Sequence, residues 1–92
     1  MKTLILLHQP MLETVKRFCP PRSALLFLQE SIYALINPDQ ATQDWLGEHT
    51  LYVLKDDAAA RGLLDHLPTQ AIVIDYAGWV ELTVTHAPIV QG

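Results

Sequence analysis

One cysteine is the only candidate for thiol nucleophile chemistry in this 92-residue chain. Cys19 lies close in sequence to Lys16, Arg17 and Arg22, and nearby cations favour the reactive thiolate over the thiol. It also follows a predicted helix and precedes two prolines, so no amides of a helix N-terminus are available to stabilise the anion. A reactive sulfur carrier and an inert structural cysteine therefore both stay open for Cys19.

One lysine and two aspartates in a row form a second candidate site. Lys55, Asp56 and Asp57 directly follow a predicted strand and could hold a small ligand or a partner protein. The same three residue types also make up solvated turns and helix caps, with Arg61 pairing with an aspartate four or five residues earlier. A binding role and a purely structural role both stay open here.

The histidines and glycines are too scattered to form a metal or cofactor site. The four histidines lie far apart, and the chain has neither a Cys-x-x-Cys nor a His-Glu-x-x-His pattern. The four glycines fit neither the dinucleotide fingerprint nor a phosphate-binding loop. We therefore expect no metal and no cofactor.

The composition indicates one compact domain over residues 1–92 with apolar side chains to spare. Half of the residues are apolar, and a chain this short buries only about 60 to 65% of its unfolded surface, so we expect some apolar side chains to contact a partner. A net charge of −4 disfavours direct binding to nucleic acid. No apolar run approaches the about 20 residues that cross a membrane. With a single cysteine and no secretory pattern, this predicts a soluble, cytoplasmic chain.

Four apolar runs predict the strands of a sheet. They cover Thr3–Leu7, Ala24–Leu28, Leu51–Leu54 and Ala71–Ile74, and their lack of polar alternation is typical of parallel strands covered on both faces. The gaps of 16, 22 and 16 residues between them are long enough for one crossover helix each. We therefore predict an α/β fold, a small three-layer domain with a mostly parallel sheet of four to five strands flanked by helices.

Each gap carries helix signals. The first predicts a helix over Pro10–Phe18, and the second offers Ser31 as a helix cap, followed by a short turn of helix over Thr42–Leu46. The third gap predicts the clearest helix, which begins at one of the two aspartates and reaches Leu67.

The last segment is ambiguous from local sequence. Alternating apolar and polar residues over Val80–Val84 indicate a strand, whereas Asp75 could cap a helix over Ala77–His86. The two interpretations are close to even. From Pro88 onward we expect the chain to fray.

Three segments of the chain are distinctive, LLFLQESIYAL (25–35), LYVLKDDAAARGL (51–63) and IVIDYAGWVELTVTH (72–86). They resemble the TusB/DsrH family of small subunits from intracellular sulfur-relay complexes. The most specific part is LKDDAAARGL, which is similar to the family's Leu-Lys-Glu/Asp-Asp before a helix that carries Ala-Arg-Gly. The resemblance spans nearly the whole chain.

The resemblance implies a small α/β domain and favours a helix over Ala77–His86. It also implies a heterohexamer with two related small subunits, one TusC/DsrF-like and one TusD/DsrE-like, which meets its sulfur donor and acceptor proteins as a complex. In the TusBCD branch this relay serves 2-thiolation of the wobble uridine in transfer RNA. In the DsrEFH branch it serves dissimilatory sulfur oxidation.

In both branches the main sulfur-carrying cysteine belongs to the TusD/DsrE subunit, so the resemblance implies a mainly structural, non-catalytic role for this chain, in a TusBCD-type complex. An alternative is a DsrH-type subunit in which Cys19 carries persulfide, because such members have one cysteine in this region. Lys55 and Arg61 could then supply positive charge to a persulfide pocket. A third interpretation is a stand-alone homo-oligomeric interaction domain.

Overall fold

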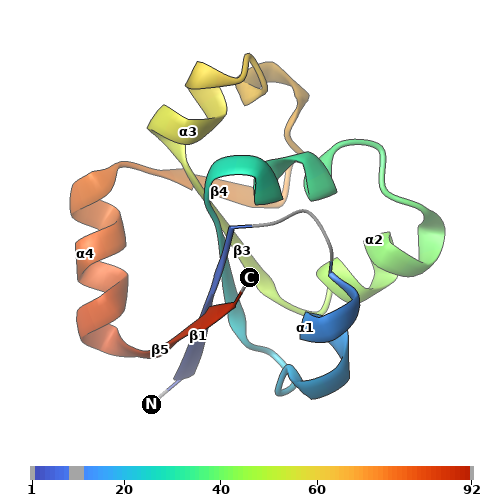
Figure 1. The fold of residues 1–92 in the computed structure, drawn as a ribbon, viewed down its shortest axis with the longest axis vertical. Coiled ribbons are helices and arrows are strands. Elements are labelled where there is room, and N and C mark those ends of the chain that lie inside the picture. The colour runs from blue at the N-terminus through green and yellow to red at the C-terminus, as the bar shows by residue number, and fades with distance from the viewer. Residues whose placement is uncertain (1, 9–11, 92) are drawn as a thin grey trace.

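The computed structural model describes residues 2–8 and 12–91, which form a five-stranded, all-parallel sheet (Figure 1). The strand order is β4-β3-β2-β1-β5, so the chain adds strands outward from β1 and then returns to place β5 on its other side. The strands are β1 Lys2–Leu7, β2 Ala24–Phe27, β3 Thr50–Leu54, β4 Ala71–Ile74 and β5 His86–Gln91. All four pairings are parallel, which confirms the predicted α/β fold with its parallel sheet.

Apolar side chains of the central strands align in rows across the sheet. Ile5, Leu25 and Leu51 occupy matching positions on one face and are almost completely buried. Leu6 and Leu26 match in the same way on the other face. Because both faces are covered, continuous apolar runs are the pattern that such strands require.

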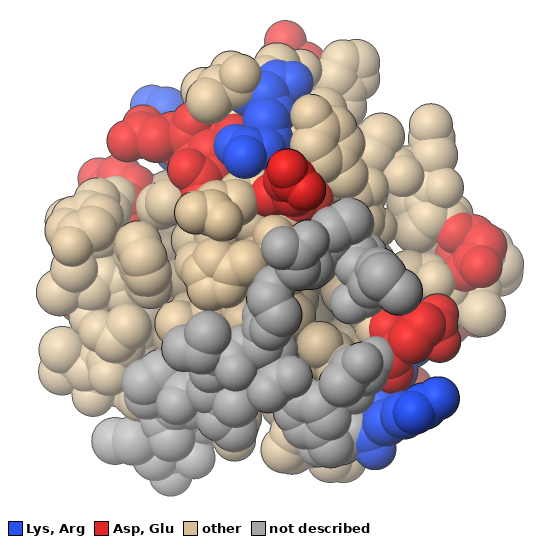
Figure 2. Space-filling view, viewed as in Figure 1, with Lys and Arg blue, Asp and Glu red and all other residues tan. Residues whose placement is uncertain are grey.

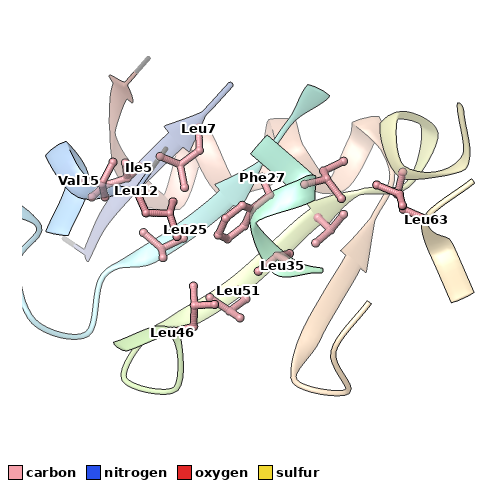
Figure 3. Packing of buried hydrophobic residues seen from close by; sticks show 13 residues of the cluster. Ile5, Leu7, Leu12, Val15, Leu25, Phe27, Leu35, Leu46, Leu51 and Leu63 are labelled. Carbon is pink, nitrogen blue, oxygen red and sulfur yellow. The ribbon is translucent and has the colours of Figure 1, made fainter. Parts of the chain in front are cut away.

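Helical segments lie in layers on both sides of the sheet (Figure 1). Among the described residues they are α1 Glu13–Phe18, the 3₁₀ helix η1 Gln29–Leu35, α2 Gln40–Leu46, α3 Lys55–Ala60, the 3₁₀ helix η2 Leu64–His66 and α4 Tyr76–Thr85. Trp79 and Leu82 of α4 pack on one face of the sheet. On the opposite face, Val15 of α1, Leu35 of η1 and Leu46 of α2 pack in one cluster with the strands (Figure 3).

The third crossover differs from its prediction in both extent and cap. α3 ends at Ala60 because Gly62 adopts a left-handed conformation with a φ of 68°, and the Leu63 amide then donates to the Ala58 carbonyl. The predicted continuation to Leu67 is wrong, and the short η2 follows instead. The predicted aspartate cap is also wrong, because both aspartates lie in the first turn of α3, after the cap position at Leu54.

The second crossover begins earlier than predicted. Ser31 does not cap a helix that follows it but lies inside η1, completely buried. Its hydroxyl accepts a hydrogen bond from the Leu28 amide at 2.9 Å and lies 2.7 Å from the carbonyl oxygen of Leu7. The true side-chain cap in this crossover is Asp39, whose carboxylate accepts from the amide of Thr42 at the start of α2.

The last segment resolves into a helix and a fifth strand. Asp75 caps α4 by accepting a hydrogen bond from the Gly78 amide at 2.8 Å, so the helical interpretation is confirmed and the strand interpretation of Val80–Val84 is wrong. The expected fraying from Pro88 is also wrong, since β5 pairs with β1 along its whole length. In the first crossover, α1 forms the later part of the predicted helix, and residues 10–11 lie outside the described residues.

Candidate functional site

The carboxyl ends of β2 and β3 bring two of the predicted site residues, Asp57 and Arg61, together with Gln29. Asp57, in the first turn of α3, accepts a hydrogen bond at 2.7 Å from the amide of Gln29, the first residue of η1. Gln29 has a φ of 51°, a conformation that is uncommon for a residue with a side chain. Arg61 donates from Nη1 to the backbone oxygen of Asp57 at 3.2 Å. Arg61 therefore does bind an aspartate, as predicted, but through the backbone carbonyl oxygen of Asp57 and not through its carboxylate.

The remaining two predicted residues at this end point into solvent. Lys55 and Asp56 are both exposed on the first turn of α3. Figure 2 shows basic and acidic side chains gathered at the end of the molecule where α3 lies. Asp57 and Arg61 thus connect α3 to the neighbouring loop and to itself, while Lys55 and Asp56 are free to meet a partner.

Cys19 lies at the opposite end of the sheet, in the loop between α1 and β2. It is a free, half-buried thiol that packs against the main apolar cluster, and its Sγ lies 3.5 Å from the Pro20 carbonyl oxygen. Burial raises the pKa of Cys19, and a hydrogen bond with the Ser23 side chain lowers it only in part. The thiol form is therefore favoured at neutral pH.

The cations near Cys19 in sequence do not act on it in the fold. The Lys16 ammonium donates to the Thr42 hydroxyl at 3.1 Å and lies 5.8 Å from the ring centre of Trp45, so it joins α1 to α2. Arg17 and Arg22 are exposed. The described contacts of the folded chain therefore give no support to a Cys19 thiolate stabilised by neighbouring cations.

A cavity of about 680 Å³ opens beside the cysteine loop at this amino end of the strands. Its walls come from the turn before β2 and the turn before β3, which are joined by a hydrogen bond of 3.3 Å from the Thr50 amide to the Ser23 carbonyl. It is lined by Pro21, Arg22, Gly47, Glu48, His49 and Thr50. Its walls carry one cation, Arg22, and one carboxylate, Glu48.

His49, on the wall of this cavity, was not singled out from the sequence. Its ring nitrogens are buried and have no hydrogen-bond partner among the described residues. Burial lowers the pKa of His49, although the Ser23 backbone and the Glu48 carboxylate oppose this, so the neutral ring is favoured at pH 7. The Trp45 ring lies against it at a centroid distance of 4.7 Å. His49 follows Trp45 by four residues, and this spacing could have indicated from the sequence that the two rings are in contact.

Comparisons with known proteins match most of this chain. A family model described as "DsrH like protein" matches residues 7–89. The chain is 33% identical over 76 residues to Protein TusB of Yersinia enterocolitica and to Protein TusB of Pectobacterium parmentieri, each time covering 82% of this chain and 80% of the relative. Protein TusB of Yersinia pestis is 30% identical over the same shares. The chain belongs to the TusB/DsrH family.

In this TusB/DsrH family member, the two groups of predicted site residues lie at opposite ends of the sheet. Cys19 precedes β2, whereas Lys55, Asp56, Asp57 and Arg61 all follow β3. In a parallel sheet these positions are separated by the length of a strand, about 15 Å for four to five residues. Lys55 and Arg61 therefore lie too far from Cys19 to act on the thiol of their own chain.

Proposed function

We propose that this TusB/DsrH family chain is a mainly structural, non-catalytic subunit of a TusBCD-type sulfur-relay complex. In this proposal it assembles in the cytoplasm with a TusC/DsrF-like and a TusD/DsrE-like subunit into a heterohexamer. The complex takes sulfur from a donor protein and passes it to an acceptor protein for 2-thiolation of the wobble uridine in transfer RNA. Family membership supports the sulfur-relay role.

The observation that carries the structural role is the environment of Cys19. Persulfide transfer proceeds by attack of a thiolate, so a carrier needs an accessible thiol with a low pKa. Burial raises the pKa of Cys19, and its neighbouring cations are exposed or bound elsewhere. These features make Cys19 a poor nucleophile, which supports transfer through a cysteine of another subunit.

The exposed charges at the other end of the sheet support a role in contacts between chains. Lys55 and Asp56 follow β3 side by side and have no structural task in this chain comparable to that of Asp57. A cation in this place could stabilise the thiolate of a neighbouring subunit's cysteine. This contribution would be electrostatic and would require no chemistry on this chain.

Purification from the native cell tests assembly first. The tagged chain should elute with two related small subunits in equal amounts, identified by mass spectrometry. If the chain elutes without them, the proposal of a heteromeric relay complex is overturned.

A Cys19→Ser variant then tests the structural role. The variant should retain both subunits and a wild-type level of 2-thiouridine in transfer RNA, measured by mass spectrometry of digested nucleosides. The complementary measurement exposes the purified wild-type chain to a persulfide donor. A gain of about 32 Da, one sulfur atom, at Cys19 with thiolation unchanged in the variant would favour the DsrH-type alternative, in which this thiol carries sulfur for dissimilatory sulfur oxidation. Loss of thiolation in the variant would overturn the non-catalytic role.

A further inference from the structure

β4 lies at one edge of the sheet, and no described strand pairs with its outer side. An edge strand presents unpaired backbone N–H and C=O groups to which another strand can bind, and natural sheets usually protect such edges with charged residues or proline. The four residues of β4, Ala71–Ile74, include neither. The opposite edge strand, β5, does contain a proline, Pro88, which has no N–H to offer. β4 is thus the unprotected edge.

Two side chains of β4 are exposed to nearly the same extent on opposite faces of the sheet. Ile72 is 46% exposed and matches Tyr52, which packs on the face that α4 covers. Val73 is 43% exposed and matches Val53, which is buried on the other face. A helix, a lipid surface or a small ligand would cover one face and leave the other. A strand that continues the sheet covers both and also pairs the backbone.

We propose that two copies of this chain pair antiparallel through β4 and form one continuous sheet. The strand that fits this edge must be uncharged and apolar on both faces, and β4 itself meets both conditions. A two-fold axis perpendicular to the sheet makes the contact self-complementary, because each copy offers the same surface. The dimer goes beyond the sulfur-relay function and does not depend on it.

The register of this pairing follows from the two-fold axis. Symmetry places one residue of β4 opposite its own copy, and the centre of the strand offers Ile72 or Val73 for that place. Asp75 is the nearest acidic residue, and it then lies opposite Thr69 or Ala71 of the second copy. The two Asp75 carboxylates never face each other, so the pairing brings no like charges together directly across the strands.

Charged substitutions on the edge test the dimer in the purified full-length chain. We expect wild type to have twice the 10.3 kDa mass of one chain in light scattering, and Ile72→Lys or Val73→Lys to raise the dimer Kd by about tenfold or more. Val80→Lys is the matched control, because Val80 is 47% exposed but lies on α4 and not on the edge strand. Val80→Lys should remain dimeric, and circular dichroism should show that all three variants are folded.

Engineered cysteines test the register without adding charge. In a Cys19→Ser background, Ile72→Cys or Val73→Cys should form an intermolecular disulfide under mild oxidation, because directly opposite residues have Cβ atoms about 4.5 to 5.5 Å apart. Val84→Cys, which is more exposed at 71% but lies on α4, should stay largely monomeric on a non-reducing gel. Disulfide crosslinking also shows whether the chain dimerises through β4 if a lysine variant fails to fold.

Three results would overturn the proposal. One is a wild-type chain that is monomeric from micromolar to millimolar concentration, which would leave the edge to a different protein. Another is a dimer that Val80→Lys disrupts and Ile72→Lys does not, which would place the contact on α4. The third is efficient crosslinking at position 84 with none at positions 72 and 73.

Discussion

The two ends of the strands use their polar residues differently. At the carboxyl end, Ser31 and Asp57 each bind backbone groups of a neighbouring segment and hold crossovers to strand ends. At the amino end, Cys19 and His49 are partly buried beside a cavity, and burial shifts the pKa of each toward its neutral form. Ser31 and Asp57 therefore have structural roles at the carboxyl end. Although Cys19 is close in sequence to several cations, the folded chain does not stabilise its thiolate.

The largest expected effect is on the free energy of unfolding when a buried serine is replaced, Ser31 at the carboxyl end or Ser23 at the amino end. Ser31→Ala should lower the free energy of unfolding by about 2 kcal/mol, because the hydroxyl is completely buried and bonds backbone atoms of both β1 and β2 ends. Ser23→Ala should cost about 1 kcal/mol, since its hydroxyl makes one bond to the backbone, to the Pro20 carbonyl at 2.6 Å. Urea unfolding measures both values. Equal losses would show that the two ends are held equally.

A smaller effect compares the adjacent aspartates of α3. Asp57→Ala should lower the free energy of unfolding by about 0.5 to 1 kcal/mol, because the amide of Gln29 loses its carboxylate partner. Asp56→Ala is the matched control, and its exposed carboxylate should leave stability unchanged. Chemical denaturation of the two variants is sufficient. A loss in Asp56→Ala as large as in Asp57→Ala would contradict the structural role given to Asp57.

The buried imidazole at the amino end should make stability depend on pH. Burial lowers the pKa of His49 from 6.5, so the unfolded chain takes up this proton more readily than the folded chain. Stability should fall as the pH drops below about 6.5 towards the folded pKa. His49→Gln should reduce that fall between pH 7 and pH 5. An identical pH profile in His49→Gln would show that another group titrates there.

The smallest effect concerns reactivity rather than stability. Burial raises the pKa of Cys19 from 9.0, so the folded chain should react with iodoacetamide more slowly at pH 7.5 than the same chain in urea. The alkylation rate of the folded chain should rise with pH until the pH exceeds the raised pKa of Cys19. Mass spectrometry of the alkylated chain follows the reaction. Faster alkylation of the folded chain than of the unfolded chain would mark Cys19 as activated and revive its role as a carrier.

Much of the fold could be predicted because each of the first four strands is a short apolar run that is recognisable from the local sequence. The four apolar runs became β1 to β4, and the gap lengths predicted the crossovers. The extent of α3 could not be predicted, since Leu63 and Leu64 fit a helical face as well as the turn that Gly62 makes. The candidate site was predicted as residues but not as an arrangement. Sequence placed Lys16 near Cys19, while the contact of Lys16 with Thr42 of α2 depends on helix packing.

The sequence by itself determined the composition of the core, the parallel sheet and the family of this chain, because apolar runs and spaced motifs are local properties. Only the tertiary structure decided between helix and strand for the last segment, where Trp79 and Leu82 pack on a sheet face that needed cover. It also decided that β5 pairs with β1 and that β4 remains at an open edge. These outcomes depend on which surfaces meet, and burial of an apolar face outweighs weak local propensity.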